Sequence, residues 1–382
     1  MRALSVRALC AGTVCAAAVT ACSSGHPQPA NLISISTGGC GSSWHLATAG
    51  WTTFHIYNGS TGGAEVDLIN PANGAIYGEV EAVGPGTTDP MRVDVGSGKF
   101  AFRCLIEDTH AITGPTVTVP GHTRGAAAIL PVTTNDLIGP AHQYHAYVAS
   151  GLDTLVTQTG TLAARIRSGD LAGARAAWLP AHLTYERLGA AYGTFGAYDG
   201  KIDGRPDGLA NGVHDAQWSG FYRLEYGLWH GQSAQALAGP AATLDKNVRA
   251  LRTAWPQMEV DLLDLGLRTH EILENALQFQ LSGHDDYGSC TTLATTEANI
   301  QGTQELLTVL HPLLVPRYAT LSTATTWLNR LQGQVRAARQ ATGSWTAAGD
   351  LSAARREQLN SVASQTLEAL APIAVITEPR RT

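Results

Sequence analysis

The stretch Gly220–Trp229 reads Gly-Phe-Tyr-Arg-Leu-Glu-Tyr-Gly-Leu-Trp, and the earlier stretch Trp178–Glu186 reads Trp-Leu-Pro-Ala-His-Leu-Thr-Tyr-Glu. Each stretch places a carboxylate among aromatic residues on what we expect to be a helix. Residues three or four apart share a helix face, so His182 lies beside Glu186 in the earlier stretch. Two such helices packed together would direct oxygen and nitrogen donors into one bundle interior, which is how a helical protein builds a metal site.

From residue 136 onward the chain has the periodicity of a helical bundle. Long segments rich in Ala, Leu and Arg carry apolar residues at three- and four-residue intervals. The Gly- and Asp-rich stretch 193–217 is predicted to be a loop, and a loop of that length inside a helical domain is usually functional. We expect helices over about 136–168, 170–192, 241–256, 259–281, 288–312, 320–342 and 348–372.

The preceding part of the chain has a different sequence pattern, with short runs of β-branched and aromatic residues. Runs such as Leu-Ile-Ser-Ile-Ser (32–36) and Thr-Thr-Phe-His-Ile-Tyr (52–57) alternate, and turn signals such as Asn-Pro-Ala-Asn-Gly (70–74) separate them. Short strands at this spacing predict a small β-sandwich. The predicted fold class is therefore two-domain, β then all-α, with a β-sandwich over 31–121, a linker over 122–135 and a helical bundle over 136–378.

Residues 1–21 have the form of a secretory signal peptide, in which two arginines precede an apolar run and a group of small residues. The sequence Val-Thr-Ala-Cys (19–22) is similar to a bacterial lipobox, so we expect Cys22 to be lipidated and residues 22–30 to form a tether. The alternative is a plain signal peptide with a chance cysteine. A lipid on Cys22 would anchor the protein to the outer face of the cytoplasmic membrane without spanning it.

The chain is acidic, with 25 basic residues, 31 acidic residues and a formal net charge of −6. Removal of the signal peptide takes out two arginines, which leaves 23 basic residues and a net charge of −8. An acidic protein without a basic patch is a poor nucleic-acid binder, so that class of partner is excluded.

The cysteines fit an oxidising compartment. Those of the signal peptide leave with it and Cys22 takes the lipid, so Cys40, Cys104 and Cys290 remain in the folded chain. One pair and one odd thiol are then expected, and we predict a disulfide between Cys40 and Cys104 inside the β domain.

A blue-copper centre is the alternative use of Cys104, because His45, His55 and His110 are nearby in the sequence. Such a centre usually has a methionine shortly after its second histidine, and the sequence has none there. A disulfide sulfur also cannot serve as a thiolate ligand. Three acids of this domain remain candidates for a second, hard-cation site, and their alternative reading is solvated acids at strand ends: Glu79, Glu81 and Glu107.

Several motifs together carry a family resemblance. In the helical half they are residues 220–229, His-Leu-Thr-Tyr-Glu (182–186), Ile-Asp-Gly (202–204) and Glu-Ala-Asn-Ile-Gln-Gly (297–302); in the β half they are Glu-Val-Glu-Ala-Val-Gly-Pro-Gly-Thr-Thr (79–88) and Phe-Arg-Cys-Leu-Ile-Glu-Asp (102–108). The helical motifs are similar to imelysin-type proteins. Nearly the whole mature chain resembles the EfeO/EfeM lipoproteins of bacterial ferrous-iron uptake, which implies a cupredoxin-like domain followed by an imelysin-like helical bundle.

The resemblance implies that helix carboxylates and an H-x-x-E motif hold a metal ion, with iron expected and copper or zinc as alternatives. The family's helix Glu falls on Glu186, its loop Asp on Asp203 and its later-helix Glu on Glu274. The Glu of H-x-x-E falls on Glu225, but the His position is occupied by Tyr222.

The tyrosine has two interpretations. Aromatic packing could have replaced a lost ligand, or a phenolate could serve as a hard donor suited to ferric iron. We favour a retained but altered metal site. For His182 the alternative is a structural role, as an isolated pair with Glu186 beside the buried Trp178. The predicted metal ligands are Glu186, Asp203, Tyr222, Glu225, Glu274 and His182.

Peptidase activity is not expected, although the imelysin family was named for a peptidase. A zinc protease needs several ligands, an open coordination position and a general base. His270-Glu271 is not followed by a second His at the H-E-x-x-H spacing, and no G-x-S-x-G elbow is present.

The predicted function is an extracytoplasmic iron-binding lipoprotein of an EfeUOB-type uptake system. The resemblance implies two partners, a membrane permease that receives the cation and a haem peroxidase. The alternatives are a degenerate envelope protein with a structural or interaction role and, least favoured, a metallopeptidase.

Overall fold

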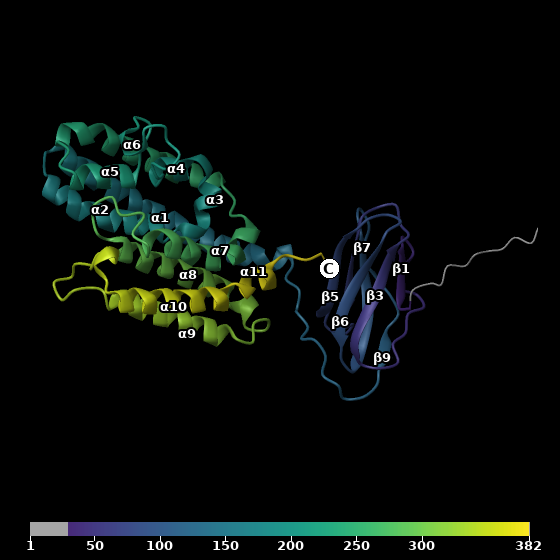
Figure 1. Cartoon of the computed structure of the whole chain (residues 1–382). Helices are drawn as coiled ribbons and strands as arrows, with labels where there is room; N and C mark the ends of the chain where they lie inside the picture. Colours follow the sequence, from purple (N-terminus) through teal and green to yellow (C-terminus); the bar gives the residue numbers. More distant parts are fainter. Residues whose placement is uncertain (1–29, 382) are drawn as a thin grey trace, which may run out of the picture.

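The computed structural model describes residues 30–381, so the predicted signal peptide and Cys22 lie outside the described residues. Strands occupy a region within residues 32–119, and helices occupy a region within 134–377 (Figure 1). The predicted order, a β domain followed by an all-α domain, is confirmed.

The β domain consists of two sheets around one apolar core. One sheet has the strand order β2-β1-β3-β6, and the other has the order β5-β4-β7-β8, with β9 paired to β7. Trp44, Phe54 and Phe102 meet edge to face in the core, with centroid separations of 4.9, 5.1 and 6.0 Å. The strands are β1 (Leu32–Ser36), β2 (Gly39–Cys40), β3 (Gly50–Asn58), β4 (Ala64–Ile69), β5 (Ile76–Val83), β6 (Thr88–Val95), β7 (Gly98–Ile106), β8 (Ile112–Thr113) and β9 (Val117–Val119).

The predicted disulfide joins the two sheets. Cys40 of β2 is bonded to Cys104 of β7, with 5.7 Å between the Cα atoms, and both residues are buried. Because its sulfur is bonded, Cys104 cannot supply a thiolate, so the blue-copper alternative is wrong for this form of the domain.

The helical domain is a bundle in which several helices begin at side-chain caps. Thr133 accepts from the backbone N–H of Asp136 while the Asp136 carboxylate accepts from that of Thr133, a capping box that starts α1. Ser233 caps α6 and Ser352 caps α10, and in each case the serine hydroxyl accepts a hydrogen bond from one backbone N–H of the first turn. The helices are α1 (Thr134–Arg167), α2 (Leu171–Glu186), α3 (Tyr192–Phe195), α4 (Asp199–Ile202), α5 (Phe221–Trp229), α6 (Ala234–Ala254), α7 (Leu262–Asn275), α8 (Thr292–Leu314), α9 (Leu321–Arg336), α10 (Ala353–Leu370) and α11 (Pro372–Thr377).

Two predicted boundaries differ from the structure in the part that forms the site. The helix expected over 170–192 ends at Glu186, and the loop expected over 193–217 contains α3 and α4. Gly196 ends α3 with a φ of 55°, a conformation that a side chain disfavours, and so separates α3 from the turns that lead to α4. The segment between α2 and α5 is therefore a series of short helical turns that places Asp203 beside the end of α2.

Helices α2 and α5, which carry the two sequence stretches singled out above, pack against each other. The indole N–H of Trp178 donates to the carbonyl oxygen of Phe221 at 2.9 Å, and Arg175 donates to that of Leu228. Gly220 precedes α5 with a φ of 98°, and a side chain there would collide with the carbonyl oxygen of Ile202. This close approach brings the start of α5 to Asp203.

The chain connects its two domains twice, through the linker and through its C-terminal tail. Figure 1 shows the tail leaving α11 and returning to the β domain near β5. Pro379 forms a bridge to Val132, and the Arg380 guanidinium pairs with Glu79 of β5 at 3.2 Å.

One described helical stretch, Ala353–Thr377, is apolar and long enough to cross a membrane by length and composition. Its buried residues include Leu359, Val362 and Leu370, which belong to the core of the bundle. We interpret it as a core helix of the bundle.

Replacement of both Cys40 and Cys104 by alanine should lower the free energy of unfolding by about 2–5 kcal/mol, because the disulfide closes a long loop between the two sheets. Urea denaturation monitored by tryptophan fluorescence measures the change. Cys290→Ser is the matched control, because Cys290 is an exposed free thiol. Equal losses in the double variant and in the control would contradict the prediction.

Candidate metal centre

Three of the predicted ligands converge at the end of α2. His182 and Glu186 lie one turn apart on α2, and Asp203 directly follows α4. The Nε2 atom of His182 lies 3.0 Å from Oε1 of Glu186 and 3.2 Å from Oδ1 of Asp203. One ligand atom from each residue lies within 4.8 Å of the other two, so a single cation could contact all three.

His182 contacts both carboxylates at ion-pair distances, but the angles of these contacts fall short of hydrogen-bond geometry. Both ring nitrogens of His182 and Oδ1 of Asp203 are buried without a hydrogen-bond partner among the described residues. Buried polar atoms without partners are rare because desolvation is costly. One imidazole nitrogen and two carboxylates that face a common point match the donor set of a first-row divalent cation.

Burial and charge act in opposite directions on these groups. Burial lowers the pKa of His182, but Asp203 and Glu186 outweigh it and raise the pKa to about 10. Burial also raises the pKa of Asp203 well above its usual value, although His182 opposes this shift. In the absence of a cation the cluster therefore holds protons, which a bound cation would displace.

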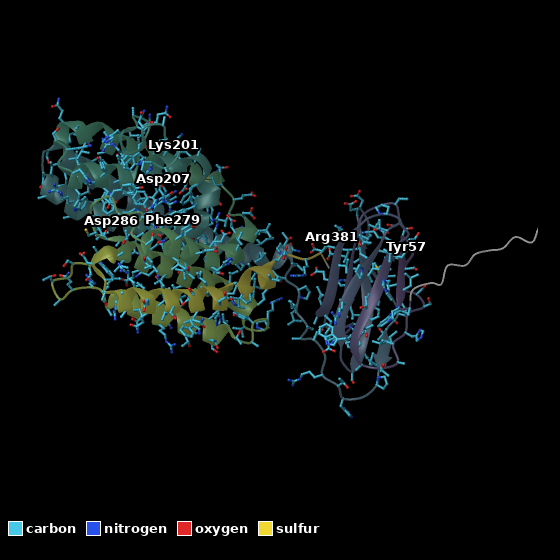
Figure 2. All side chains as sticks on the ribbon, in the orientation of Figure 1. Tyr57, Lys201, Asp207, Phe279, Asp286 and Arg381 are labelled. Carbon is cyan, nitrogen blue, oxygen red and sulfur yellow. A yellow bond between two sulfur atoms is a disulfide. The ribbon has the colours of Figure 1, made fainter. Side chains whose placement is uncertain are left out.

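The cluster forms part of the wall of a cavity of about 650 Å³, which gives a cation access to Glu186 and Asp203. His182 lies behind these two carboxylates and does not line the cavity. Asp207 and Phe279, two further residues of the cavity wall, are labelled in Figure 2 in the region where the teal and green parts of the bundle meet.

Two further polar residues hold the cluster in place and were not predicted. The side-chain amide of Asn299 donates to Oε2 of Glu186 at 3.1 Å, which leaves Oε1 directed at His182. Asp199 lies one helical turn before Asp203 and accepts a 2.6 Å hydrogen bond from the Tyr185 hydroxyl. Sequence signals were present for both, since Asn299 lies in the motif at 297–302 and Asp199 has helix spacing from Asp203.

Tyr222 reaches the cavity, but its hydroxyl has another partner. The O–H donates to Oδ2 of Asp285 at 3.3 Å, while the ring lies 5.2 Å from the His182 ring. Burial, with Asp203 and Glu186 nearby, raises the pKa of Tyr222 well above its usual value. In this structure the residue is a neutral phenol beside the cluster.

Glu225 is buried next to the cluster and anchors a loop. Its Oε1 accepts from the backbone N–H groups of Tyr287 and Ser289 at 3.1 and 3.0 Å, while Oε2 has no hydrogen-bond partner among the described residues. Burial raises its pKa to about 7, although the hydrogen bonds from Ser289 oppose this shift.

The structure does not bring Glu274 to this cluster. It is exposed on α7 and lines a different, open pocket with His270 and Glu368. The reason is helix phase, since the adjacent Ile272 and Leu273 occupy the buried face of α7. The expected convergence of all the predicted carboxylates in one cleft therefore includes Glu186 and Asp203 but neither Glu274 nor Glu225, which does not line the cavity.

The predicted acids of the β domain do not form one group either. Glu81 is exposed. The carboxylate of Glu107 accepts a hydrogen bond from the backbone N–H of Gly63 at 3.1 Å and is not part of the group that contains Glu79. Glu79 instead lies with Glu65 and Asp67, with one oxygen from each within 4.8 Å of the others. Each of these acids has an arginine nearby: Asp67–Arg103 at 2.8 Å, Glu79–Arg380 at 3.2 Å and Glu65–Arg381 at 3.9 Å.

Glu225 should make the stability of the protein pH-dependent. Because its pKa rises from 4.5 to about 7 on folding, the folded protein holds a proton that the unfolded chain releases. Its contribution is then fully present below pH 4.5 and is lost as the pH rises to about 7, a loss on the order of 3 kcal/mol.

Glu225→Gln should remove this loss, because glutamine stays neutral and its oxygen can accept the same two hydrogen bonds. Urea denaturation of both proteins at about pH 5 and about pH 8 measures the difference. An equal fall in the free energy of unfolding for the wild type and the variant would contradict the prediction.

Comparison with known proteins identifies the family of this chain. The imelysin family model matches residues 140–373, which is more than half of the chain. The iron uptake system component EfeO of Yersinia pestis is 29% identical over 277 residues, which cover 70% of this chain and 69% of that protein. The component of the same name from Escherichia coli (strain K12) is 28% identical over 273 residues, with the same shares covered. This chain belongs to the imelysin family.

Proposed function

We propose that this chain is an extracytoplasmic iron-binding component of an iron uptake system. The observation that carries the proposal is the convergence of His182, Glu186 and Asp203 on the wall of an accessible cavity. The relatives named as iron uptake system components support iron as the cation. Copper and zinc are the competing ions for a site with one imidazole and two carboxylates.

A purely structural role would require each buried acid of the cluster to be neutralised within the protein. Asp67 in the β domain meets this requirement through Arg103. Glu186 and Asp203, in contrast, have no arginine or lysine partner among the described ion pairs and share His182, whose single positive charge can balance only one of the two carboxylates. This difference favours a cation-binding role for the helical cluster.

The remaining parts of the proposal rest on the family resemblance. The protein would be held at the outer face of the cytoplasmic membrane by a lipid on Cys22 and would deliver iron to a membrane permease, with a haem peroxidase as second partner. Hydrolysis is not part of the proposed function, since the relatives are named for iron uptake.

Titration of the purified protein with Fe(II) under argon, followed by calorimetry, tests the proposal. We expect about one ion per chain at this site. Loss of a residue that contacts a metal ligand but not the metal itself costs roughly 10–100-fold in affinity. Glu186→Gln and Asp203→Asn change proposed direct ligands, so each should weaken Fe(II) binding by more than this. Glu274→Gln is the matched control, because it removes the same charge from an exposed site outside the cluster. Equal affinities in all four proteins would refute the assigned site.

Tyr222 is proposed as an additional ligand when the iron is ferric, since its side chain lines the same cavity. Titration with Fe(III) should then give a visible tyrosinate-to-iron charge-transfer band that is lost in Tyr222→Phe. Binding of Fe(III) without such a band would assign Tyr222 to packing alone.

A further inference from the structure

Arg205 places a positive charge within the wall of the proposed cation cavity. It follows Asp203 by two residues and lines the same cavity as Glu186 and Asp199. A guanidinium is always charged and pairs readily with carboxylates. Free to move, it would compete with an incoming cation for these acids.

The guanidinium is held by a buried carboxylate on another segment. Its Nε and Nη2 atoms donate to Oδ1 and Oδ2 of Asp285 at 2.8 and 3.1 Å, a bidentate arrangement. Its plane covers the Phe279 ring, with 3.6 Å from Cζ to the ring centroid. These contacts hold the charge of Arg205 at the segment that follows α7.

Asp285 is not one of the three residues of the cation cluster, but its carboxylate accepts several hydrogen bonds. Its side chain is only 1% exposed and also accepts hydrogen bonds from Tyr222 and Gln280, at 3.3 and 2.9 Å. It does not line the cavity and is not one of the converging ligands. An influence of Asp285 on cation binding must therefore pass through the groups that it holds.

We propose that Asp285 is a positioning residue that keeps the Arg205 guanidinium away from Glu186, Asp203 and Asp199, so that these carboxylates remain available to the cation. The inference rests on the proposed function. Without Asp285, the carboxylates that line the same cavity as Arg205, those of Glu186, Asp199, Asp203 and Asp207, become available to the guanidinium. The guanidinium would pair with them and act as an internal competitor.

A double-variant cycle with Fe(II) as the probe tests this role. Asp285→Asn should weaken Fe(II) binding at least about tenfold, because a like charge placed beside the site opposes the incoming cation. Arg205→Gln should bind within about threefold of the wild type or more tightly, since it removes the competitor. The Asp285→Asn, Arg205→Gln double variant should recover the affinity of Arg205→Gln. Calorimetry under argon gives the affinities, and circular dichroism with thermal unfolding checks that each variant is folded.

The rescue distinguishes positioning from other roles. If the double variant binds no better than Asp285→Asn, Asp285 acts as a ligand or as a support of the fold, and the proposal is overturned. It is also overturned if Asp285→Asn binds like the wild type while Glu186→Gln does not, and the cation site then stands. A wild-type protein that binds no Fe(II) would overturn the proposed function, and this inference with it.

Discussion

The burial of His182 between two carboxylates is the constraint on which the rest of the helical domain depends. Removing a charge from water is costly unless partners replace the solvent, and Glu186 and Asp203 can do so only if α2, α4 and α5 hold fixed positions. The packing around them is accordingly dense. Trp178 and Phe221, whose rings flank His182, are fully buried and are tied together by a hydrogen bond from the indole to the backbone. Rigid aromatic walls thus preserve an arrangement of donors that would otherwise separate or collapse onto other partners.

Helix spacing was enough to predict the parts of the site that lie on one element. His182 and Glu186 are four residues apart on α2, so their proximity follows from helix geometry alone. Asp203 could be included only through the family resemblance, because its approach depends on the short turns after Glu186 and on the close passage of Gly220 over Ile202. Most of those turns lie in a stretch that the sequence predicts to be a loop, and Gly196 separates two of them.

Predictions that depended on contacts between distant segments were less successful, for physical reasons. Glu274 has the residue type of a ligand, but it lies on the exposed face of α7 and so points away from the cluster. Asp285 lies in a loop whose position is set by Glu225, and no periodicity links those two residues. The overall order of a β-sandwich and a helical bundle was predictable because it depends on periodicity and turn composition, which are local properties.

The two clusters of acidic groups found within residues 30–381 show why a count of carboxylates does not identify a cation site. Glu65, Asp67 and Glu79 are as close together as the groups of the helical cluster, but arginines approach them, including two from the C-terminal tail. These arginines offset part of the negative charge of the cluster, and the same contacts connect the β domain to the end of the helical chain. In the helical cluster the nearby guanidinium of Arg205 is bound to Asp285 instead. What distinguishes a cation site from an ion-pair network is thus where the neighbouring arginines are held, and in this chain that depends on residues outside either cluster.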